Sequence, residues 1–259
     1  MVELTTLSKY PFLNASKKYI KNNGPSIEEL LDDPLYDRAR LTGIDRLDNA
    51  LETSDIGDRK IVTESDCIIE LLSYPIARMI AVCIDDLFFR RRYALAEARH
   101  VYKNLINEKP TFLINIANEF KINVEHEKDS NKISIFFVDY LQNAPTRYKE
   151  WKMINRAMNN GFIDISHKDL ARIIQESLRN RINIELDSKT CSKKVYDIFT
   201  SDIIRIKNLV AIQRKNYTEM PIGKLDIKIL PPCMKNLLSS IQAGENVPHM
   251  GRFALVAFL

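Results

Sequence analysis

Apolar residues recur every three or four positions through most of the chain, which is the period of helices that bury one face. This spacing predicts helices at 34–53, from 63 or 65 through 76, and at 87–106, 109–121, 167–184 and 195–215. Ser26 and Glu29 have the spacing of a capping box, and Ser166 is a second predicted cap. Pro75 is expected to kink the long apolar helix that contains it.

The period changes in the middle of the chain, where alternating apolar residues indicate strands. One strand is predicted from Ile133 to the neighbourhood of residues 139–141, and a second at 161–165. The basic segment 147–160 between them contains the single tryptophan and has a helix-like pattern. The order of elements predicts a mainly α protein, a helical body with a small α+β subdomain at about 123–185.

The end of the chain differs in character from the body, which we expect to span 1–215. Residues 216–229 have the pattern of a linker, and the region 230–259 opens with a Pro-Pro helix start. Seven consecutive apolar residues finish the sequence, and such a surface is an aggregation hazard unless more chain covers it. The sequence is therefore expected to be a fragment that stops inside its last domain.

Composition narrows the class of protein. Seven glycines in 259 residues are few, and neither G-x-G-x-x-G nor G-x-x-x-x-G-K-[ST] occurs, which disfavours the common glycine-rich phosphate loops. The N-terminus lacks the pattern of a signal peptide, and Glu70 and Arg78 interrupt the longest apolar stretch. We expect a soluble cytoplasmic protein with no membrane span.

The four cysteines form no C-x-x-C pair, which fits a reducing compartment. Cys67 and Cys83 lie on apolar helical faces and are predicted to be core residues. Cys233 follows Pro-Pro at a helix start, where the helix dipole favours a thiolate. Both burial and metal ligation remain open for Cys233.

Charge is spread unevenly along the sequence. Residues 1–89 carry 10 basic and 16 acidic side chains, and the remainder carries 28 and 18. Such an asymmetry suggests a basic surface for a polyanion. The most basic predicted helix offers four candidate contacts to a phosphate backbone, Arg90, Arg91, Arg92 and Arg99. A solvated helix face is the alternative for these arginines.

Catalytic chemistry has little support in the sequence. A nucleotidyl transferase needs two or three carboxylates on metal ions, and Asp139 and Asp164 are the candidates at predicted strand ends. Neither belongs to a D-x-D pair, and a structural cap or ion pair is the expected role. Asp85 and Asp86 are adjacent on a predicted helix, where neighbouring side chains diverge, so they make a poor metal clamp.

Several segments together resemble one family. The stretch LPPCMKNLLSSIQAGENVPHMGRFALVAFL, residues 230–259, is similar to the start of the iron–sulfur domain in the large, non-catalytic subunit of archaeal and eukaryotic DNA primase. Weaker similarities to the archaeal form occur in the family's order at KYPF, FFRRRYALAEARHVYKNL, FFVDYLQNA and WKMINRAMNNGFIDISHKDLARIIQESL. The resemblance covers nearly the whole chain.

The resemblance implies that Cys233 is the first of four cysteine ligands of a 4Fe-4S cluster. The other three would lie beyond residue 259, so this chain alone should not hold the cluster, which needs about four thiolates. His249, Arg252 and nearby Asn246 are implied to contact the template and the 5′ triphosphate end of the primer. Pro248 departs from some eukaryotic relatives, which carry a basic residue there.

The resemblance also implies a partner and a role. The family's catalytic carboxylates reside in a small subunit, which the helical body with its α/β subdomain docks, so this chain is not expected to be an enzyme alone. It would bind single-stranded template and RNA primer and act in the cytoplasm, at the nucleoid. We hypothesise that Phe136, Phe137 and Tyr140 contribute to docking, with a core role equally open. A helical nucleic-acid-binding scaffold without a primase role is the alternative function.

Overall fold

The computed structural model describes residues 3–127, 132–218 and 230–258, with the side chains of 215–218 excepted. The chain forms two compact units, Met1–Ile212 and Gln213–Leu259, each described by itself. The predicted linker at 216–229 is only partly described, because residues 216–218 belong to a helix and 219–229 lie outside the described residues.

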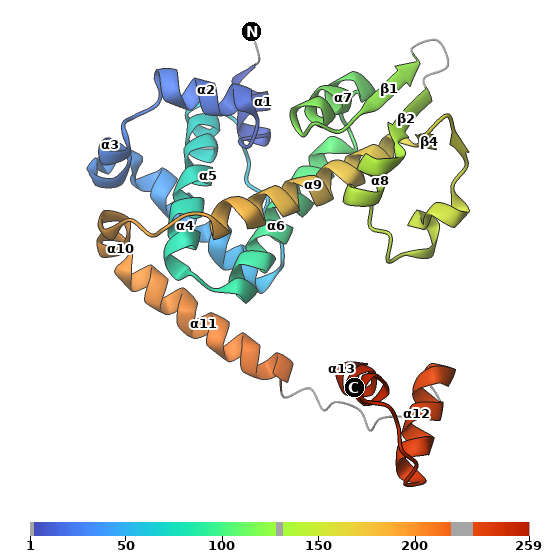
Figure 1. Cartoon of the computed structure of the whole chain (residues 1–259). Helices are drawn as coiled ribbons and strands as arrows, with labels where there is room; N and C mark the ends of the chain where they lie inside the picture. Colours follow the sequence, from blue (N-terminus) through green and yellow to red (C-terminus); the bar gives the residue numbers. More distant parts are fainter. Residues whose placement is uncertain (1–2, 128–131, 219–229, 259) are drawn as a thin grey trace. The chain divides into compact units, whose positions relative to one another are not determined.

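The first unit is mainly helical, as predicted (Figure 1). Its helices before the sheet are α1 (Leu4–Lys9), α2 (Asn14–Asn23), α3 (Ile27–Asp32), the 3-10 turn η1 (Pro34–Tyr36), α4 (Asp37–Glu52), α5 (Glu64–Ile84), α6 (Leu87–Leu105) and α7 (Pro110–Glu119). The helices after the sheet are α9 (His167–Asp187), α10 (Lys193–Ile198) and α11 (Thr200–Thr218), whose residues after Ile212 belong to the second unit. Figure 1 shows α9 running from the sheet to the neighbourhood of α5, so this one helix connects the two parts of the unit.

Capping boxes start three of these helices. The Ser26, Thr63 and Ser166 side chains each accept a hydrogen bond from the backbone N–H three residues later, and the acidic side chain at that later position accepts one in return. The helix starts predicted at these residues are confirmed. Pro75 lies inside α5, which continues through it to Ile84.

Helix α5 is the central core helix of the first unit. Among the described residues it has the length and composition to cross a membrane, but 72% of its most apolar window is buried within the protein, as in the core helix of a soluble protein. Ile76 and Ile80 are completely buried. Gly43 lets α4 approach α5 closely, because a Cβ there would lie 2.9 Å from Cγ2 of Ile76.

A buried charge network joins α4, α5 and α6. The Arg46 guanidinium donates to both oxygens of Glu97, from Nε at 3.1 Å and from Nη2 at 2.9 Å, and it also pairs with Glu70. Arg59 completes the network with hydrogen bonds of 2.6 and 2.9 Å to Glu70. The side chains of Arg46 and Glu97 are each 2% exposed, so these charges depend on one another for solvation.

The small sheet is antiparallel, with strand order β1-β2-β4-β3. Its strands are β1 (Val124–Glu127), β2 (Lys132–Phe136), β3 (Met158–Asn159) and β4 (Phe162–Ile165). Ile133 and Ile135 of β2 pair with Ile165 and Ile163 of β4, and all four side chains are buried. The sequence predicted β2 and β4 but missed the two outer strands.

The predicted end of the first strand was wrong. Phe137 does not continue β2 but begins α8 (Phe137–Asn143), and its N–H donates to Gly161 O at 2.9 Å. The apolar run at 136–138 fits a strand or a helix equally by pattern alone. The Asp139 carboxylate accepts a hydrogen bond of 2.9 Å from the Asn123 N–H. This contact favours the helix because it holds the first turn of α8 against the loop that follows α7.

The helix-like pattern at 147–160 does not correspond to a helix in the structure. This segment forms the short 3-10 turns η2 (Lys149–Trp151) and η3 (Met153–Asn155) and then β3. Asn160 and Gly161 have φ of 50° and 83°, the left-handed conformation that a two-residue hairpin turn requires. The Asn-Gly pair is the sequence signal that could have revealed the β3–β4 hairpin.

One cysteine prediction needs correction. Cys83 is buried as expected, but it is joined by a disulfide to Cys191, which lies between α9 and α10. The two residues are 108 positions apart, so no local spacing could indicate the bond. Cys67 is a free, buried cysteine, as predicted.

The second unit contains α12 (Pro232–Gln242) and α13 (His249–Phe258) among its described residues. Val247, in the turn between them, and Leu255 of α13 are buried. Gly251 makes room for this packing, since a Cβ at that position would lie 2.9 Å from Val247 Cγ1 and 3.0 Å from Leu237 Cδ2.

Candidate functional site

The second unit brings three predicted binding residues together at the start of α13. His249 is the first residue of the helix, and Arg252 lies one turn later. The Arg252 Nη2 donates to Asn246 Oδ1 at 3.1 Å, and all three side chains are exposed. A helix N-terminus with an adjacent arginine favours an anionic ligand such as a phosphate.

Cys233 is exposed at the start of α12. The sequence left both burial and metal ligation open for Cys233, and its exposure excludes burial among the described residues. Pro231 precedes the helix and Pro232 is its first residue, which explains why the helix begins here.

The cysteines present do not complete a site for a four-iron cluster. Such a cluster requires about four thiolates. Cys67 is buried in α5 of the other unit, and Cys83 and Cys191 are bonded to each other. Cys233 is thus the single exposed free thiol among the described cysteines, and its ligand role stays a prediction.

The four arginines of α6 fall into two groups. Arg90 pairs with Asp187 and lies 3.6 Å from Asp85. Arg92 donates to Leu51 O at 2.7 Å and to Ser54 Oγ at 3.1 Å. These two side chains hold neighbouring elements to α6, which is a structural role.

Arg91 and Arg99 differ from the other two arginines of α6. Both side chains are exposed, and neither forms an ion pair with another residue in the described ranges. Their guanidinium groups remain available to a phosphate backbone. Of the four arginines predicted to contact such a backbone, only these two keep that candidate role.

The aromatic residues of the α/β part also have different environments. Phe136 and Phe137 are half-buried, with ring centroids 4.9 Å apart. Tyr140 is completely buried, stacks on Trp151 and donates its hydroxyl hydrogen to Trp151 O at 3.0 Å. The Tyr140 side chain therefore has no surface to offer a partner.

A set of exposed apolar residues in the same part was not singled out from the sequence. They lie in and after α8 and in the segment that leads to β3: Val138, Leu141, Tyr148, Ile154 and Met158. Ile154 is 90% exposed and Met158 is 53% exposed. Exposed apolar side chains also occur elsewhere in the described residues, but a group of them in one small subdomain is compatible with a surface that binds another protein.

The candidate catalytic carboxylates have structural partners instead. Asp139 accepts from the Asn123 backbone as described above, and Asp164 forms an ion pair of 2.9 Å with Lys132 across the sheet. Asp85 ends α5 in a left-handed conformation, while Asp86 caps α6 by accepting from the Phe89 N–H. The structural roles expected for these residues are consistent with these contacts.

One further cluster was missed by sequence reasoning. Asp55, Asp58 and His100 place their potential ligand atoms within 4.8 Å of one another. The Lys103 amine already lies 2.9 Å from Asp55 and 3.8 Å from Asp58. Burial and the nearby Arg46 lower the pKa of His100, so its ring is neutral at pH 7 and the lysine is the cation that balances these carboxylates.

Comparison with known proteins gives a consistent assignment. A family model for the C-terminal domain of the large subunit of eukaryotic and archaeal DNA primase matches residues 223–259. Over 254 residues, the chain is 35% identical to the DNA primase large subunit PriL of Methanosarcina acetivorans, covering 98% of this chain and 68% of the relative.

Two other relatives carry the same name. PriL of Methanococcoides burtonii is 34% identical over 268 residues, covering 98% of this chain and 71% of the relative. PriL of Halobacterium salinarum is 26% identical over 271 residues, covering 97% and 72%. The similarity therefore includes both units of the chain and is not restricted to its C-terminal part.

Proposed function

Because the chain belongs to the family of archaeal and eukaryotic DNA primase large subunits, we propose that it is the non-catalytic subunit of a heterodimeric primase. It binds the small catalytic subunit and helps to position template DNA and the initiating nucleotide for RNA primer synthesis in replication. The observation that carries the proposal is 35% identity to a primase large subunit across 98% of the chain.

The proposed mechanism is indirect catalysis. The small subunit joins ribonucleotides, while this chain holds template and initiating nucleotide near that active site. Holding reactants together raises their effective concentration and fixes their geometry, and a partner without catalytic groups can make both contributions. The structural contacts of Asp139 and Asp164 fit this division of labour, since each carboxylate already has a partner.

The α/β part supplies the proposed docking surface for the small subunit. Its candidates are the half-buried Phe136 and Phe137 and the exposed Leu141 and Ile154. Large apolar side chains that become buried on binding dominate the affinity of most protein interfaces. Tyr140 is left out of this surface because it belongs to the core.

Docking is tested by co-purifying the small subunit with this chain and with the variant Leu141→Glu, Ile154→Glu. Charge at exposed positions leaves the fold intact, and we expect the variant to lose the partner. Leu35→Glu is the matched control, because Leu35 is 76% exposed but lies in η1, outside the α/β part. A double variant that still binds as tightly as the parent chain would refute this docking surface.

The start of α13 supplies the proposed contact to the template and to the 5′ triphosphate of the primer. His249 and Arg252 offer cationic or hydrogen-bonding groups beside a helix N-terminus, and the hydrogen bond to Asn246 orients Arg252. Because the Arg252 guanidinium has further donors, it can bind phosphate while it keeps the contact to Asn246.

Initiation is tested by primer synthesis on single-stranded DNA. The small subunit is assayed alone, with this chain, and with the variant His249→Ala, Arg252→Ala. We expect the chain to increase initiation and the variant to reduce that increase while still binding the small subunit. Met250→Ala is the control, since Met250 is 73% exposed on the same helical turn. If the chain neither binds the small subunit nor alters synthesis, a nucleic-acid scaffold without a primase role is favoured.

Cys233 is proposed as a cluster ligand and not as a contact to the partner or to the template. Its exposed position at the start of α12 is compatible with a cluster ligand, but this chain's own cysteines do not complete the set. The expected location is the cytoplasm, where a replication primase meets its template.

A further inference from the structure

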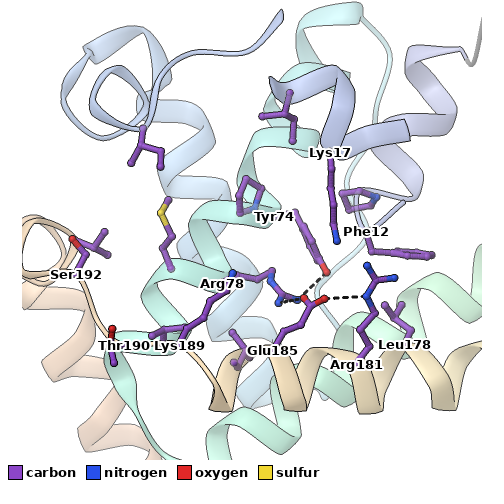
Figure 2. Close-up of a pocket in the computed structure, with 18 residues that line it drawn as sticks. Phe12, Lys17, Tyr74, Arg78, Leu178, Arg181, Glu185, Lys189, Thr190 and Ser192 are labelled. Atoms are coloured by element: carbon purple, nitrogen blue, oxygen red, sulfur yellow. Dashed lines mark hydrogen bonds and ion pairs between the residues drawn. The ribbon is translucent and has the colours of Figure 1, made fainter. Parts of the chain in front are cut away.

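A cavity of about 680 Å³ lies within the first unit (Figure 2). Its walls come from α2, α5 and α9 and from the segment that connects α9 to α10. Small-molecule sites in proteins typically occupy roughly 300–1,000 Å³. Neither the proposed docking surface nor the proposed template contact uses this cavity.

Much of the cavity wall is aliphatic. The residues that form it include Ile20, Met79, Val82, Leu186 and Val195. Two aromatic residues also reach the wall, but Phe12 and Tyr74 are only 2% and 7% exposed, which leaves little ring surface for stacking a nucleobase. The apolar part of a ligand is therefore better matched by an aliphatic chain than by a nucleotide base.

Cationic side chains also line the cavity. Four cations and one carboxylate line it: Lys17, Arg78, Arg181, Lys189 and Glu185. The Glu185 carboxylate already accepts from Arg78 at 2.5 Å and from Arg181 at 3.0 Å, as the dashed lines of Figure 2 show. The positive charge of the lysines is not neutralised by this carboxylate alone.

Lys17 is the cation most suited to an incoming anion. Figure 2 shows its side chain pointing from α2 into the cavity. Its amine forms no hydrogen bond or ion pair with any residue that the structure describes. Partial desolvation of this otherwise exposed side chain, together with the Arg181 guanidinium, lowers its pKa. A bound anion would relieve this repulsion, so the charge arrangement favours an anionic ligand.

The cavity is also fixed by a covalent bond. Val82 precedes Cys83, and Thr190 and Ser192 flank Cys191, so the disulfide ties the α5 wall to the wall that follows α9. A preformed site loses less free energy to ordering when a ligand binds.

We propose that this cavity binds a small amphiphilic anion, a single carboxylate or similar group attached to an aliphatic chain. The anionic group lies at Lys17 and Arg181, and the chain extends along the aliphatic wall that contains Met79 and Val82. Cationic side chains and aliphatic surface in the same cavity together select this class of ligand over neutral lipids and over aliphatic cations.

The test is calorimetric titration of the whole chain with decanoate below its micellar concentration. Decyltrimethylammonium carries the same chain with opposite charge, and hexanoate carries the same charge with four fewer methylenes. We expect decanoate to bind at least tenfold more tightly than the cation. Affinity should fall by up to about fourfold for each methylene removed, because each buried methylene contributes a similar increment.

Variants separate this site from non-specific binding. Lys17→Gln is expected to weaken decanoate about tenfold, since it removes a charge-assisted contact. Lys18→Gln is the control, because Lys18 is exposed like its neighbour Lys17 but does not line the cavity. Absent decanoate binding, equal affinity for the cation, or an unchanged affinity in Lys17→Gln would each overturn the proposal.

Discussion

Arg46 of α4 and Glu97 of α6 form a two-pronged ion pair in the centre of the helical body, with hydrogen bonds of 3.1 and 2.9 Å. The residues are 51 positions apart, and each side chain is 2% exposed. Burial of one charge without the other is costly, so this pair links the correct packing of α4, α5 and α6 to the stability of the fold.

Removing one member of this pair should destabilise the protein strongly. We expect Glu97→Gln to lower the free energy of unfolding by about 3 kcal/mol, because it leaves part of the Arg46 charge uncompensated. Urea denaturation measures the change. Asp48→Asn is the control, since Asp48 pairs with the 44% exposed Arg205 and should cost less than about 1 kcal/mol. Equal losses in the two variants would contradict the assigned role of the buried pair.

Stability should fall in acid because of Glu70. Burial alone would raise its pKa, but Arg46 and Arg59 outweigh that effect and hold the pKa at about 2, against an ordinary value of 4.5. A carboxyl with a depressed folded-state pKa contributes stability that is fully present above the unfolded value and is lost as pH falls toward the folded value. The contribution of Glu70 is therefore lost between about pH 4.5 and 2.

Urea midpoints measured between pH 6 and pH 3 check this expectation. The parent chain should lose stability progressively below about pH 4.5, and Glu70→Gln should show a shallower pH dependence from a lower starting stability. Asp202→Asn in the first turn of α11 is a suitable control, because Asp202 lies 3.3 Å from Arg205, which is 44% exposed. A parallel pH dependence in the parent and in Glu70→Gln would show that other carboxylates govern acid unfolding.

Reduction of the disulfide should also destabilise the first unit. Cys83–Cys191 closes a loop of 108 residues, for which chain-entropy estimates give roughly 4–5 kcal/mol. Thermal unfolding with and without a phosphine reductant measures this difference. Cys191→Ser should remove the response to reductant, whereas Cys233→Ser should keep it because Cys233 is free and exposed. A parent chain whose melting temperature is insensitive to reductant would argue against the bond.

Two arginines of α6 should contribute to nucleic-acid binding and two should not. We expect Arg91→Gln and Arg99→Gln each to weaken single-stranded DNA binding and to reduce the salt dependence by about 0.7 per lost phosphate contact. Affinity measured over a series of salt concentrations reports both effects. Arg92→Gln is the matched comparison: it should lower thermal stability, because Arg92 bonds to Leu51 O and Ser54 Oγ. Unchanged salt slopes in Arg91→Gln and Arg99→Gln would remove α6 from the binding surface.

Local patterns in the sequence determined most helices and their starts. The capping boxes at Ser26 and Ser166 and the apolar period of α4 and α9 depend on residues a few positions apart, so the sequence alone predicts them. The candidate contacts at Asn246, His249 and Arg252 came from the family resemblance of residues 230–259, and their role stays a prediction. The helices and their caps were predictable because the residues that interact in them are close together in the sequence.

The tertiary structure decided what depends on distant partners. The Phe136–Val138 run divides between strand and helix because of contacts to Gly161 and Asn123, and Tyr140 is buried because Trp151 folds back onto it. The Cys83–Cys191 bond, the Arg46 network and the cavity at Lys17 each join segments that are far apart in sequence. No local pattern encodes such contacts, since their energy arises only when the chain has brought the partners together and excluded water.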